Sequence, residues 1–382
     1  MKPLLVIAGE ASGDLHGAEL LRELKKRQPE LRVIGVGGAG MTPYLDRKIA
    51  DVTDLGVVGL VEVIRHIPRL LALKKEILRV AAEEGIGAAL LIDYKDFNFR
   101  LATALRKASP NVLLHQYVCP QVWASRAGRI PAYGRTFDSL YCLFDFEPPL
   151  FQGCAVDARF VGNPLVEMMA PEVDRETFFR ETGLIGAKPL VALLPGSRGG
   201  ELQRLLPPLV ALVKAWATDP NHCEVQWVLP VAPTLDVALV RAQLEGAPVV
   251  LVEGRSLAAR AFADAALVCS GTATLETALL GTPFAILYKL NPFTYQIAKR
   301  VVKLPHFGLA NVVAGRQVAP ELLQDAVNPK RLAIELTKLL EPTHAAEVRK
   351  DLAEVRAHLG EPGAARRVAE HLLEKLGQSE AL

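Results

Sequence analysis

The chain has 382 residues, of which 50% are hydrophobic and 23% charged, and its formal net charge is only +2. This length suits two domains of ordinary size, and the near-neutral charge gives no overall argument for nucleic-acid binding. No stretch approaches the roughly 20 uncharged apolar residues of a transmembrane helix, and the apolar start of the chain meets Glu10 too early for a signal peptide.

Apolar runs typical of buried strands alternate with helical patterns along the chain. The runs are Leu4–Ala8, Arg32–Val36, Ala88–Ile92, Val112–Tyr117 and Ser139–Leu143 in the first half, and Leu190–Leu194, Val225–Val231, Val249–Val252, Ala266–Cys269 and Phe284–Tyr288 in the second. Helical patterns such as Leu15–Arg27 and Phe97–Ala108 lie between them. The alternation predicts an α/β fold with two Rossmann-like, doubly wound domains, each built on a mostly parallel sheet.

The domain boundary is predicted at Phe160–Pro164. We expect an N-terminal domain over residues 1–165, a C-terminal domain over 166–358, and a helix over 359–382 that packs back toward the N-terminal domain. Doubly wound domains bind ligands at the carboxyl ends of their strands, so an interdomain cleft is the expected site. The five cysteines contain no C-x-x-C pair, which favours buried free thiols in a reducing cytoplasm over disulfides or a metal site.

The first strand-end loop is Gly9–Asp14. It has the position of a dinucleotide-binding loop but lacks the three glycines, and Glu10 and Asp14 would repel a phosphate. We interpret it as an acceptor-side or catalytic loop. The alternative is a helix cap made by Ser12 or Asp14.

The segment Leu60–Arg79 interleaves apolar residues with cations, and Pro68 suits the first turn of a second helix there. Such a basic, apolar helical pair can lie on an anionic bilayer surface. The alternative is ordinary packing on the sheet with a solvated cationic face.

Two carboxylates, Asp93 and Asp96, follow the strand Ala88–Ile92. A carboxylate at the end of a central strand is a candidate general base. The alternative for Asp96 is an N-cap of the helix that begins at Phe97.

In the second half, two strand–turn–helix stretches suit a diphosphate. Gly196, Ser197 and Arg198 form a glycine-rich turn in which Ser197 can cap the helix and Arg198 can make a bidentate phosphate contact. The second stretch contains Ser270, Gly271, Thr272 and Thr274, where free N–H groups and hydroxyls can bind an anion.

Glu276, one turn into the second of these helices, can accept both hydroxyls of a ribose. The alternative for this stretch is a plain helix capped by Ser270 or Thr272. Asn311 to Arg316 and Glu321 to Gln324 are expected to form a loop and a short helix, and the residues alone give them no role.

Taken together, the motifs resemble the lipid-A-disaccharide synthase family. The matching residues are Gly9–Asp14, Gly59–Glu62, Asp96–Asn98, Val122–Ala124, Phe146–Glu147, Phe160–Gly162, Leu194–Glu201, Gly271–Glu276, Pro292–Thr294, Lys299–Arg300, Asn311, Ala314–Arg316 and Glu321–Gln324. The sequence departs from the family pattern at Tyr94-Lys95, Ser125, Asn163 and Ala310. These departures concern loop conformation and acyl-chain contacts more than the class of reaction.

The resemblance implies a GT-B glycosyltransferase that needs no metal or other cofactor. It implies inverting transfer of diacylglucosamine from UDP to the 6-hydroxyl of diacylglucosamine 1-phosphate. It further implies a cytoplasmic enzyme bound peripherally to the inner membrane, and it leaves a homodimer open. Two other classes stay open: a related UDP-sugar enzyme such as a UDP-N-acetylglucosamine 2-epimerase, and a non-catalytic peripheral protein that binds nucleotide or lipid.

Within this mechanism, Arg198, the turn at Gly271–Thr274 and Arg316 are expected to neutralise the departing diphosphate. Ser12, Asn311 and Glu321 join the substrate- and UDP-binding set through the resemblance, and Glu276 holds the ribose. Asp96 is the first candidate for the general base, with Glu10 and Asp14 as alternatives.

Overall fold

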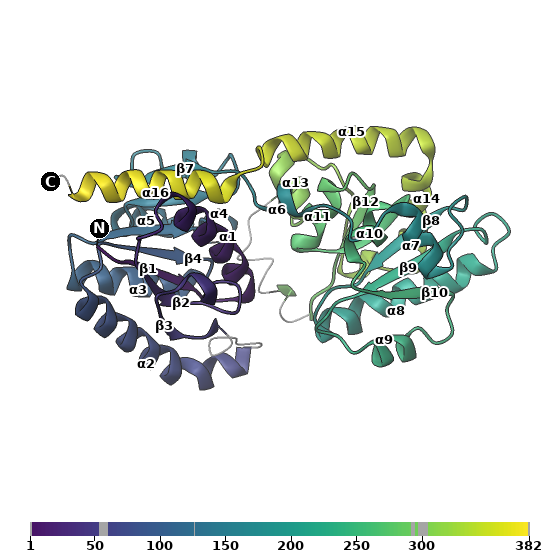
Figure 1. Cartoon of the computed structure of the whole chain (residues 1–382). Coiled ribbons are helices and arrows are strands. Elements are labelled where there is room, and N and C mark those ends of the chain that lie inside the picture. The colour runs from purple at the N-terminus through teal and green to yellow at the C-terminus, as the bar shows by residue number, and fades with distance from the viewer. Residues whose placement is uncertain (1, 53–59, 126, 292–294, 297–304, 381–382) are drawn as a thin grey trace. The chain divides into compact units, whose positions relative to one another are not determined.

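The computed structural model describes residues 2–52, 60–125, 127–291, 295–296 and 305–380 (Figure 1). The chain forms two compact units: unit 1 comprises Met1–Pro164 together with Gly360–Leu382, and unit 2 comprises Leu165–Leu359. The boundaries expected from the sequence lie within one residue of these. The family motifs at Gly59, Pro292–Thr294 and Lys299–Arg300 lie outside the described residues.

Unit 1 is built on a seven-stranded parallel sheet of order β3-β2-β1-β4-β5-β6-β7. Its strands are β1 (Leu4–Ala8), β2 (Val33–Val36), β3 (Arg47–Ala50), β4 (Ala88–Ile92), β5 (Leu113–Tyr117), β6 (Ser139–Cys142) and β7 (Asp157–Phe160). In register, Leu4 lies between Val33 and Ala88. Every residue of β1 and β4 is buried, because helices cover both faces of a doubly wound parallel sheet.

Two hydrophobic cores lie on the two faces of this sheet. The helices of one face are α2 (Leu60–Glu84), α3 (Lys95–Ala108) and α5 (Ile130–Thr136), which bury residues such as Ile77, Leu101 and Tyr133. The helices of the other face are α1 (Ala11–Arg27) and the C-terminal α16 (Ala364–Glu380), whose Leu20 and Leu372 share one cluster. The end of the chain is therefore part of unit 1.

Unit 2 is built on a six-stranded parallel sheet of order β10-β9-β8-β11-β12-β13. Its strands are β8 (Leu190–Leu194), β9 (Gln226–Val231), β10 (Val249–Glu253), β11 (Ala265–Cys269), β12 (Phe284–Tyr288) and β13 (Glu321–Leu323). Its helices include α6 (Leu165–Met168), α7 (Arg175–Thr182), α8 (Gly199–Ala217), α9 (Val237–Gln243), α10 (Ser256–Ala261), α11 (Thr272–Leu279), α13 (Leu309–Ala314), α14 (Pro329–Leu340) and α15 (Pro342–His358).

Both sheets have a point where the strand order reverses, between β1 and β4 in unit 1 and between β8 and β11 in unit 2. Ligands of open parallel sheets bind at the carboxyl ends of the strands beside such a point. The four loops that leave these strands contain Glu10, Asp93, Gly196 and Ser270. The topology thus places the loops selected from the sequence at the expected binding edge of each sheet.

Several elements differ from the sequence-based expectation. The edge strands β3, β7 and β13 were not predicted as strands, because Arg47–Ala50 and Asp157–Phe160 carry charged residues and Glu321–Leu323 is only three residues long. The expected short helix at Glu321 is wrong, and the expected loop at Asn311 is helix α13.

The starts of three helices were also predicted wrongly. Helix α1 begins at Ala11 rather than at Leu15, so Ser12 and Asp14 lie in its first turn. Helix α3 begins at Lys95 rather than at Phe97, so Asp96 is its second residue. Pro68 lies inside a single 25-residue helix, α2, and does not open a second helix.

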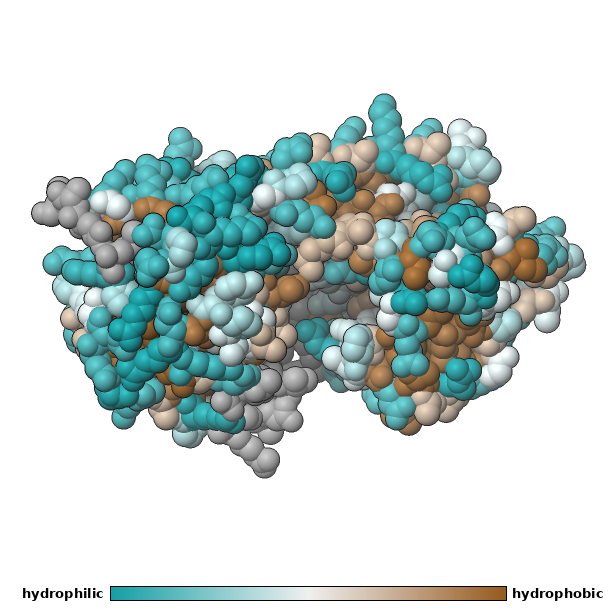
Figure 2. All heavy atoms as spheres, in the orientation of Figure 1, coloured by the Kyte–Doolittle hydropathy of each residue, from teal (hydrophilic) through white to brown (hydrophobic). Residues whose placement is uncertain are grey.

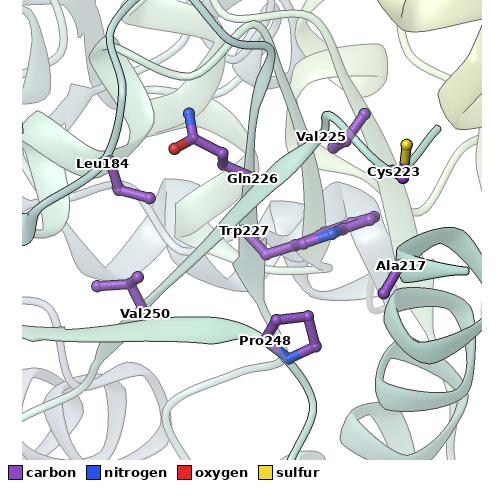
Figure 3. Close-up of a pocket in the computed structure, with 8 residues that line it drawn as sticks. All are labelled: Leu184, Ala217, Cys223, Val225, Gln226, Trp227, Pro248 and Val250. Carbon is purple, nitrogen blue, oxygen red and sulfur yellow. The ribbon is translucent and has the colours of Figure 1, made fainter.

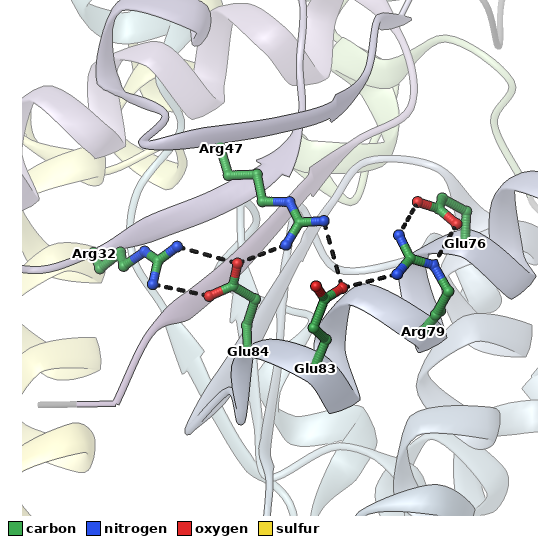
Figure 4. Close-up of polar contacts among 6 residues, drawn as sticks. All are labelled: Arg32, Arg47, Glu76, Arg79, Glu83 and Glu84. Atoms are coloured by element: carbon green, nitrogen blue, oxygen red, sulfur yellow. Dashed lines mark hydrogen bonds and ion pairs between the residues drawn. The ribbon is translucent and has the colours of Figure 1, made fainter.

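A chain of ion pairs fastens the C-terminal half of α2 to the β2–β3 edge of unit 1 (Figure 4). Glu84 pairs with Arg32 at 2.9 Å and with Arg47 at 2.7 Å, and Glu83 pairs with Arg79 at 2.8 Å. Most of these groups are partly exposed, so solvent screens the pairs and each contributes little to stability.

The visible surface differs between the units. Figure 2 shows mainly hydrophilic residues over unit 1, and larger hydrophobic areas on unit 2 near α8, α9 and β10. No helix within the described part of the chain is long and apolar enough to cross a membrane.

Candidate functional site

A cavity of about 650 Å³ opens at the binding edge of the unit 1 sheet. The loops after β1 and β4 and the helices α2 and α3 supply its walls. The lining residues are Glu10, Ile67, Leu70, Leu71, Lys74, Asp93, Tyr94, Asp96, Phe97 and Arg100. The cavity therefore combines three carboxylates and two cations with a mostly apolar wall.

Asp96 is an exposed carboxylate of this cavity. Its side chain is 53% exposed, and Oδ1 accepts a hydrogen bond of 2.5 Å from Arg129 Nη1. The N-cap of α3 is Tyr94, and no side chain caps this helix start in the described structure. The alternative role of Asp96 as an N-cap is therefore wrong.

The other two carboxylates of the cavity lie beside it. Asp93 Oδ2 accepts a hydrogen bond from the Ser12 hydroxyl at 3.1 Å, which connects the loops after β4 and β1. Glu10 is the N-cap residue of α1, but its side chain makes no cap hydrogen bond. Ser12 and Asp14 do not act as the N-cap either, so the helix-cap alternative for this loop is also wrong.

Asp14 lies apart from this group. Its buried carboxylate accepts hydrogen bonds from the backbone N–H groups of Gly38 (2.6 Å), Gly40 (2.9 Å) and Met41 (3.1 Å). A side chain at Gly38 would meet Asp14 Oδ2 at 2.7 Å, so the close approach needs glycine. Asp14 does not line the cavity. This geometry argues for a structural role and against Asp14 as a general base.

The backbone is strained at the ends of β4 and β5. Asp93 has φ = 39° and Val118 has φ = 64°. Aspartate tolerates the left-handed region, whereas a β-branched valine there is a genuine outlier. Such strain clusters at functional sites, where the surroundings fix it.

In unit 2, the turn after β8 is organised by Glu201 rather than by Ser197. Glu201 Oε2 accepts hydrogen bonds from the backbone N–H groups of Ser197 (3.1 Å) and Arg198 (3.3 Å). Arg198 is the N-cap residue of α8, so the predicted cap by Ser197 is wrong. The Arg198 side chain is 75% exposed and pairs with Glu201 at 3.0 Å. Gly196 has φ = 112°, which only glycine adopts readily.

The turn after β11 leaves the start of α11 without a side-chain cap. Gly271 is the N-cap residue, with φ = 149° and ψ = −160° and no cap hydrogen bond from a side chain in the described structure. The Ser270 hydroxyl donates instead to the carbonyl of Phe307 at 3.1 Å, and Thr272 is the first helical residue. The cap alternative is therefore wrong for both residues, and the helix N-terminus suits an anion.

Thr274 is fully buried, and its hydroxyl donates to the Gly271 carbonyl at 2.8 Å. This bond fixes the turn. It argues against a direct contact between Thr274 and a phosphate.

Glu276 pairs with a buried arginine that the sequence reasoning missed. Arg260 Nη1 lies 2.5 Å from Glu276 Oε2, and the arginine side chain is only 4% exposed. Arg260 also donates from Nε to the Ser256 carbonyl at 3.1 Å. A charged residue inside the otherwise apolar pattern of Leu257–Ala263 was the available signal. Arg260 orients the Glu276 carboxylate.

Asn311 and Glu321 form hydrogen bonds that hold the segment next to the turn after β11. Asn311 is fully buried; its Oδ1 accepts from Val318 N and Ala319 N, and its Nδ2 donates to Glu321 Oε1 at 2.8 Å. Glu321 accepts from the backbone N–H of Gly308 at 3.0 Å. These contacts fix the segment that receives the Ser270 hydroxyl, so they favour positioning over direct UDP contact.

Arg316 does not join the other predicted phosphate ligands in the described contacts. Its Nη2 pairs with Asp351 at 2.8 Å and with Glu354 at 2.6 Å, both on α15. These two carboxylates already neutralise the guanidinium. The geometry therefore argues against Arg316 as a diphosphate ligand.

A second cavity, of about 350 Å³, lies in unit 2 (Figure 3). Gln226 and Trp227 begin β9, and Pro248 directly precedes β10, so these lining residues lie at the amino ends of the strands. This is the edge of the sheet opposite to the strand-end turns. We assign no substrate to it.

Comparisons with known proteins agree with this arrangement. The family model described as lipid-A-disaccharide synthetase matches residues 4–375. A lipid-A-disaccharide synthase of Anaeromyxobacter dehalogenans is 43% identical over 374 residues, covering 97% of this chain and 96% of that protein. One of Myxococcus xanthus is 41% identical over 377 residues, covering 98% and 97%.

Solved structures share the fold at low sequence identity. A putative UDP-N-acetylglucosamine 2-epimerase from Listeria monocytogenes aligns with a TM-score of 0.63 at 14% identity, covering 99% of this chain and 98% of that one. The glycotransferase of kitacinnamycin aligns with a TM-score of 0.64 at 16% identity, covering 98% and 100%. The fold is thus of the GT-B type, and the chain belongs to the lipid-A-disaccharide synthase family of UDP-sugar glycosyltransferases.

Proposed function

We propose that the protein transfers 2,3-diacylglucosamine from its UDP derivative to the 6-hydroxyl of 2,3-diacylglucosamine 1-phosphate. The reaction inverts the anomeric carbon and releases UDP, as a step of lipid A biosynthesis. Family membership supports the reaction class. The unit 1 cavity is the observation that carries the assignment of the acceptor.

The chemistry of this cavity matches a lipid-linked sugar phosphate. Ile67, Leu71 and Phe97 offer apolar surface for acyl chains. Lys74 and Arg100 offer positive charge for the phosphate. A water-soluble sugar nucleotide has no acyl chains to place against the apolar part of this wall.

Asp96 is the proposed general base. A sugar hydroxyl is a poor nucleophile at neutral pH, so its proton must leave as the new bond forms. Arg129 binds Oδ1 of Asp96 and orients the carboxylate that we assign to the acceptor hydroxyl. Glu10 lines the same cavity and is the alternative base.

UDP is assigned to the turns of unit 2. The N-terminus of α11 at Gly271 and Thr272, together with the exposed Arg198, neutralises the diphosphate as it departs. Glu276, held by Arg260 through Oε2, accepts the ribose hydroxyls through Oε1.

A peripheral position on the cytoplasmic face of the inner membrane fits the same region of unit 1. Ile67 and Leu71 are 45% and 52% exposed on α2, beside the exposed Arg69 and Lys75. Exposed apolar residues flanked by cations favour an anionic lipid surface. The acceptor would then enter the cavity from the leaflet.

The test is incubation of the purified protein with UDP-diacylglucosamine and diacylglucosamine 1-phosphate. We expect UDP and the disaccharide phosphate to appear in equal amounts by mass spectrometry, with a β anomeric linkage by NMR. A parallel incubation with UDP-N-acetylglucosamine alone should leave it unchanged. Epimerisation of that compound, or no turnover of the lipid pair, would contradict the proposal.

A further inference from the structure

Two thiols and a carboxylate meet inside unit 1, outside the residues that line the cavity. The Sγ atoms of Cys119 and Cys142 and a carboxylate oxygen of Glu147 all lie within 4.8 Å of one another, and all three residues are buried. Cys142 ends β6, and Cys119 follows β5. In the part of the chain that the structure describes, no other group of three His, Cys, Asp or Glu donors is this tight.

The strained backbone at Val118 brings the two thiols together. Tyr117 and Val118 both pack on the core that contains α1 and α16, whereas Cys119 packs on the opposite core with Cys142. Side chains alternate along an undistorted strand, so Cys119 would lie on the same face as Tyr117, in the core with α1 and α16. The left-handed φ of Val118 breaks this alternation and strains the backbone there.

Hydrogen bonds from a tryptophan side chain and from the backbone orient Glu147. Oε1 accepts from Trp123 Nε1 at 3.0 Å, and Oε2 accepts from the backbone N–H groups of Leu143 (3.1 Å) and Phe144 (3.2 Å). Hydrogen bonds of this kind hold the carboxylates that ligate metals.

Two thiols beside a carboxylate provide donors that suit a cation, because a bound cation deprotonates a coordinating thiol. The neighbouring carboxylate also favours a cation over a disulfide, because it adds a third donor.

We propose that Cys119, Cys142 and Glu147 form a binding site for a thiophilic divalent cation of the zinc class. Thiolate sulfur and carboxylate oxygen are ligands that Zn²⁺ takes, with Zn–S bonds of about 2.3 Å. Three atoms within 4.8 Å of one another surround a point less than about 2.8 Å from each, so small side-chain shifts complete the site.

Binding releases the two thiol protons and involves no change of oxidation state. Three protein ligands leave the fourth tetrahedral position to water or another small ligand. The ion would join the carboxyl ends of β5 and β6 and fix Trp123 through Glu147. The site is independent of the proposed transfer reaction.

The experiment is a titration of the reduced, full-length protein with Co²⁺, which reports thiolate ligands by a charge-transfer absorption band. We expect one equivalent of Co²⁺ to bind and Zn²⁺ to displace it. Cys119→Ser and Cys142→Ser should each weaken binding at least tenfold, and Glu147→Gln should weaken it too. Cys223→Ser, at an exposed cysteine, is the matched control and should bind as the wild type does.

A second measurement uses only the wild-type protein, so it does not depend on whether the variants fold. In the wild-type protein, alkylation followed by mass spectrometry at increasing denaturant should show that Zn²⁺ protects Cys119 and Cys142, which are buried and react only when the fold opens, but not the exposed Cys223. The proposal is overturned by absence of a 1:1 thiolate band, by loss of binding in Cys223→Ser alone, or by a Cys119–Cys142 disulfide that forms without metal.

Discussion

The two strand-end sites share one topology but are built from different chemical groups. In unit 1, side chains from α2 and α3 enclose a cavity with carboxylates, cations and apolar residues. In unit 2, the turns at Gly196 and Gly271 present backbone, and buried partners such as Arg260 hold the few side chains. Under the proposed function, one sheet architecture would serve a lipid-linked sugar in unit 1 and a nucleotide in unit 2.

The largest expected effect comes from the proposed base in unit 1. Asparagine at position 96 keeps the size of the side chain but cannot take the proton, so Asp96→Asn should lower kcat by about 10²–10⁴-fold. UDP affinity and the melting temperature should stay near wild type, because the carboxylate is exposed and does not cap α3. Steady-state kinetics with both lipid substrates measure this.

Glu10→Gln is the companion variant, since Glu10 lines the same cavity. If kcat stays within a few-fold of wild type in Asp96→Asn and falls strongly in Glu10→Gln, the general base is Glu10.

In unit 2, Glu276→Ala should weaken UDP binding by about 2–5 kcal/mol, since a desolvated charged partner is lost. Arg260→Gln should also weaken UDP binding, because Arg260 orients the Glu276 carboxylate. The loss of binding free energy in the double variant should be smaller than the sum of the two single losses. Isothermal titration calorimetry with UDP gives the values. Arg255→Gln, at an exposed ion pair with Glu181, is the control and should bind UDP normally. Wild-type affinity in Glu276→Ala would refute the ribose assignment.

The sequence was most informative where one short stretch determines the structure. Continuous apolar runs identified the buried strands, and the order of elements placed Asp93, Gly196 and Ser270 at the ends of strands. Contacts between distant residues could not be read in this way. Asp14 is bound by Gly38, 24 positions away, and Arg316 is neutralised by Asp351, 35 positions away. The pairing of Arg260 with Glu276 and the strain at Val118 likewise depend on how the elements pack.

The units should also differ in their response to acid. Burial lowers the pKa of His115 in unit 1 to about 3, and burial also lowers the pKa of His371. An unfolded histidine titrates near 6.5. The neutral histidines therefore stabilise the folded state fully above about pH 6.5. For His115 this contribution to the free energy of unfolding is lost as the pH falls toward 3, by up to about 1.4 kcal/mol per pH unit.

Hydrogen exchange measured between pH 7 and pH 4 should thus show the sheet of unit 1 losing protection before that of unit 2. His115→Phe should make unit 1 less sensitive to pH in this range. Equal sensitivity of wild type and variant would show that His115 does not control the acid response.

The smallest effect concerns the surface of α2. Replacing Arg69 and Lys75 with Ser should reduce co-sedimentation with anionic vesicles by about 1 kcal/mol per cation, and salt should reduce it for the wild type. Replacing Arg79 with Ser is the control, because this residue is engaged by Glu76 and Glu83 (Figure 4). Equal sedimentation of wild type and the Arg69/Lys75 variant would exclude this segment as the membrane contact.

The central claim is that unit 1 binds the lipid acceptor and unit 2 binds UDP. Its most direct test is hydrogen–deuterium exchange of the full chain with each ligand alone. UDP should protect residues 196–201 and 271–276 and leave 67–74 and 93–100 unchanged. Diacylglucosamine 1-phosphate should do the reverse. Protection of the unit 1 segments by UDP, or of the unit 2 turns by the lipid acceptor, would contradict the assignment of the two sites.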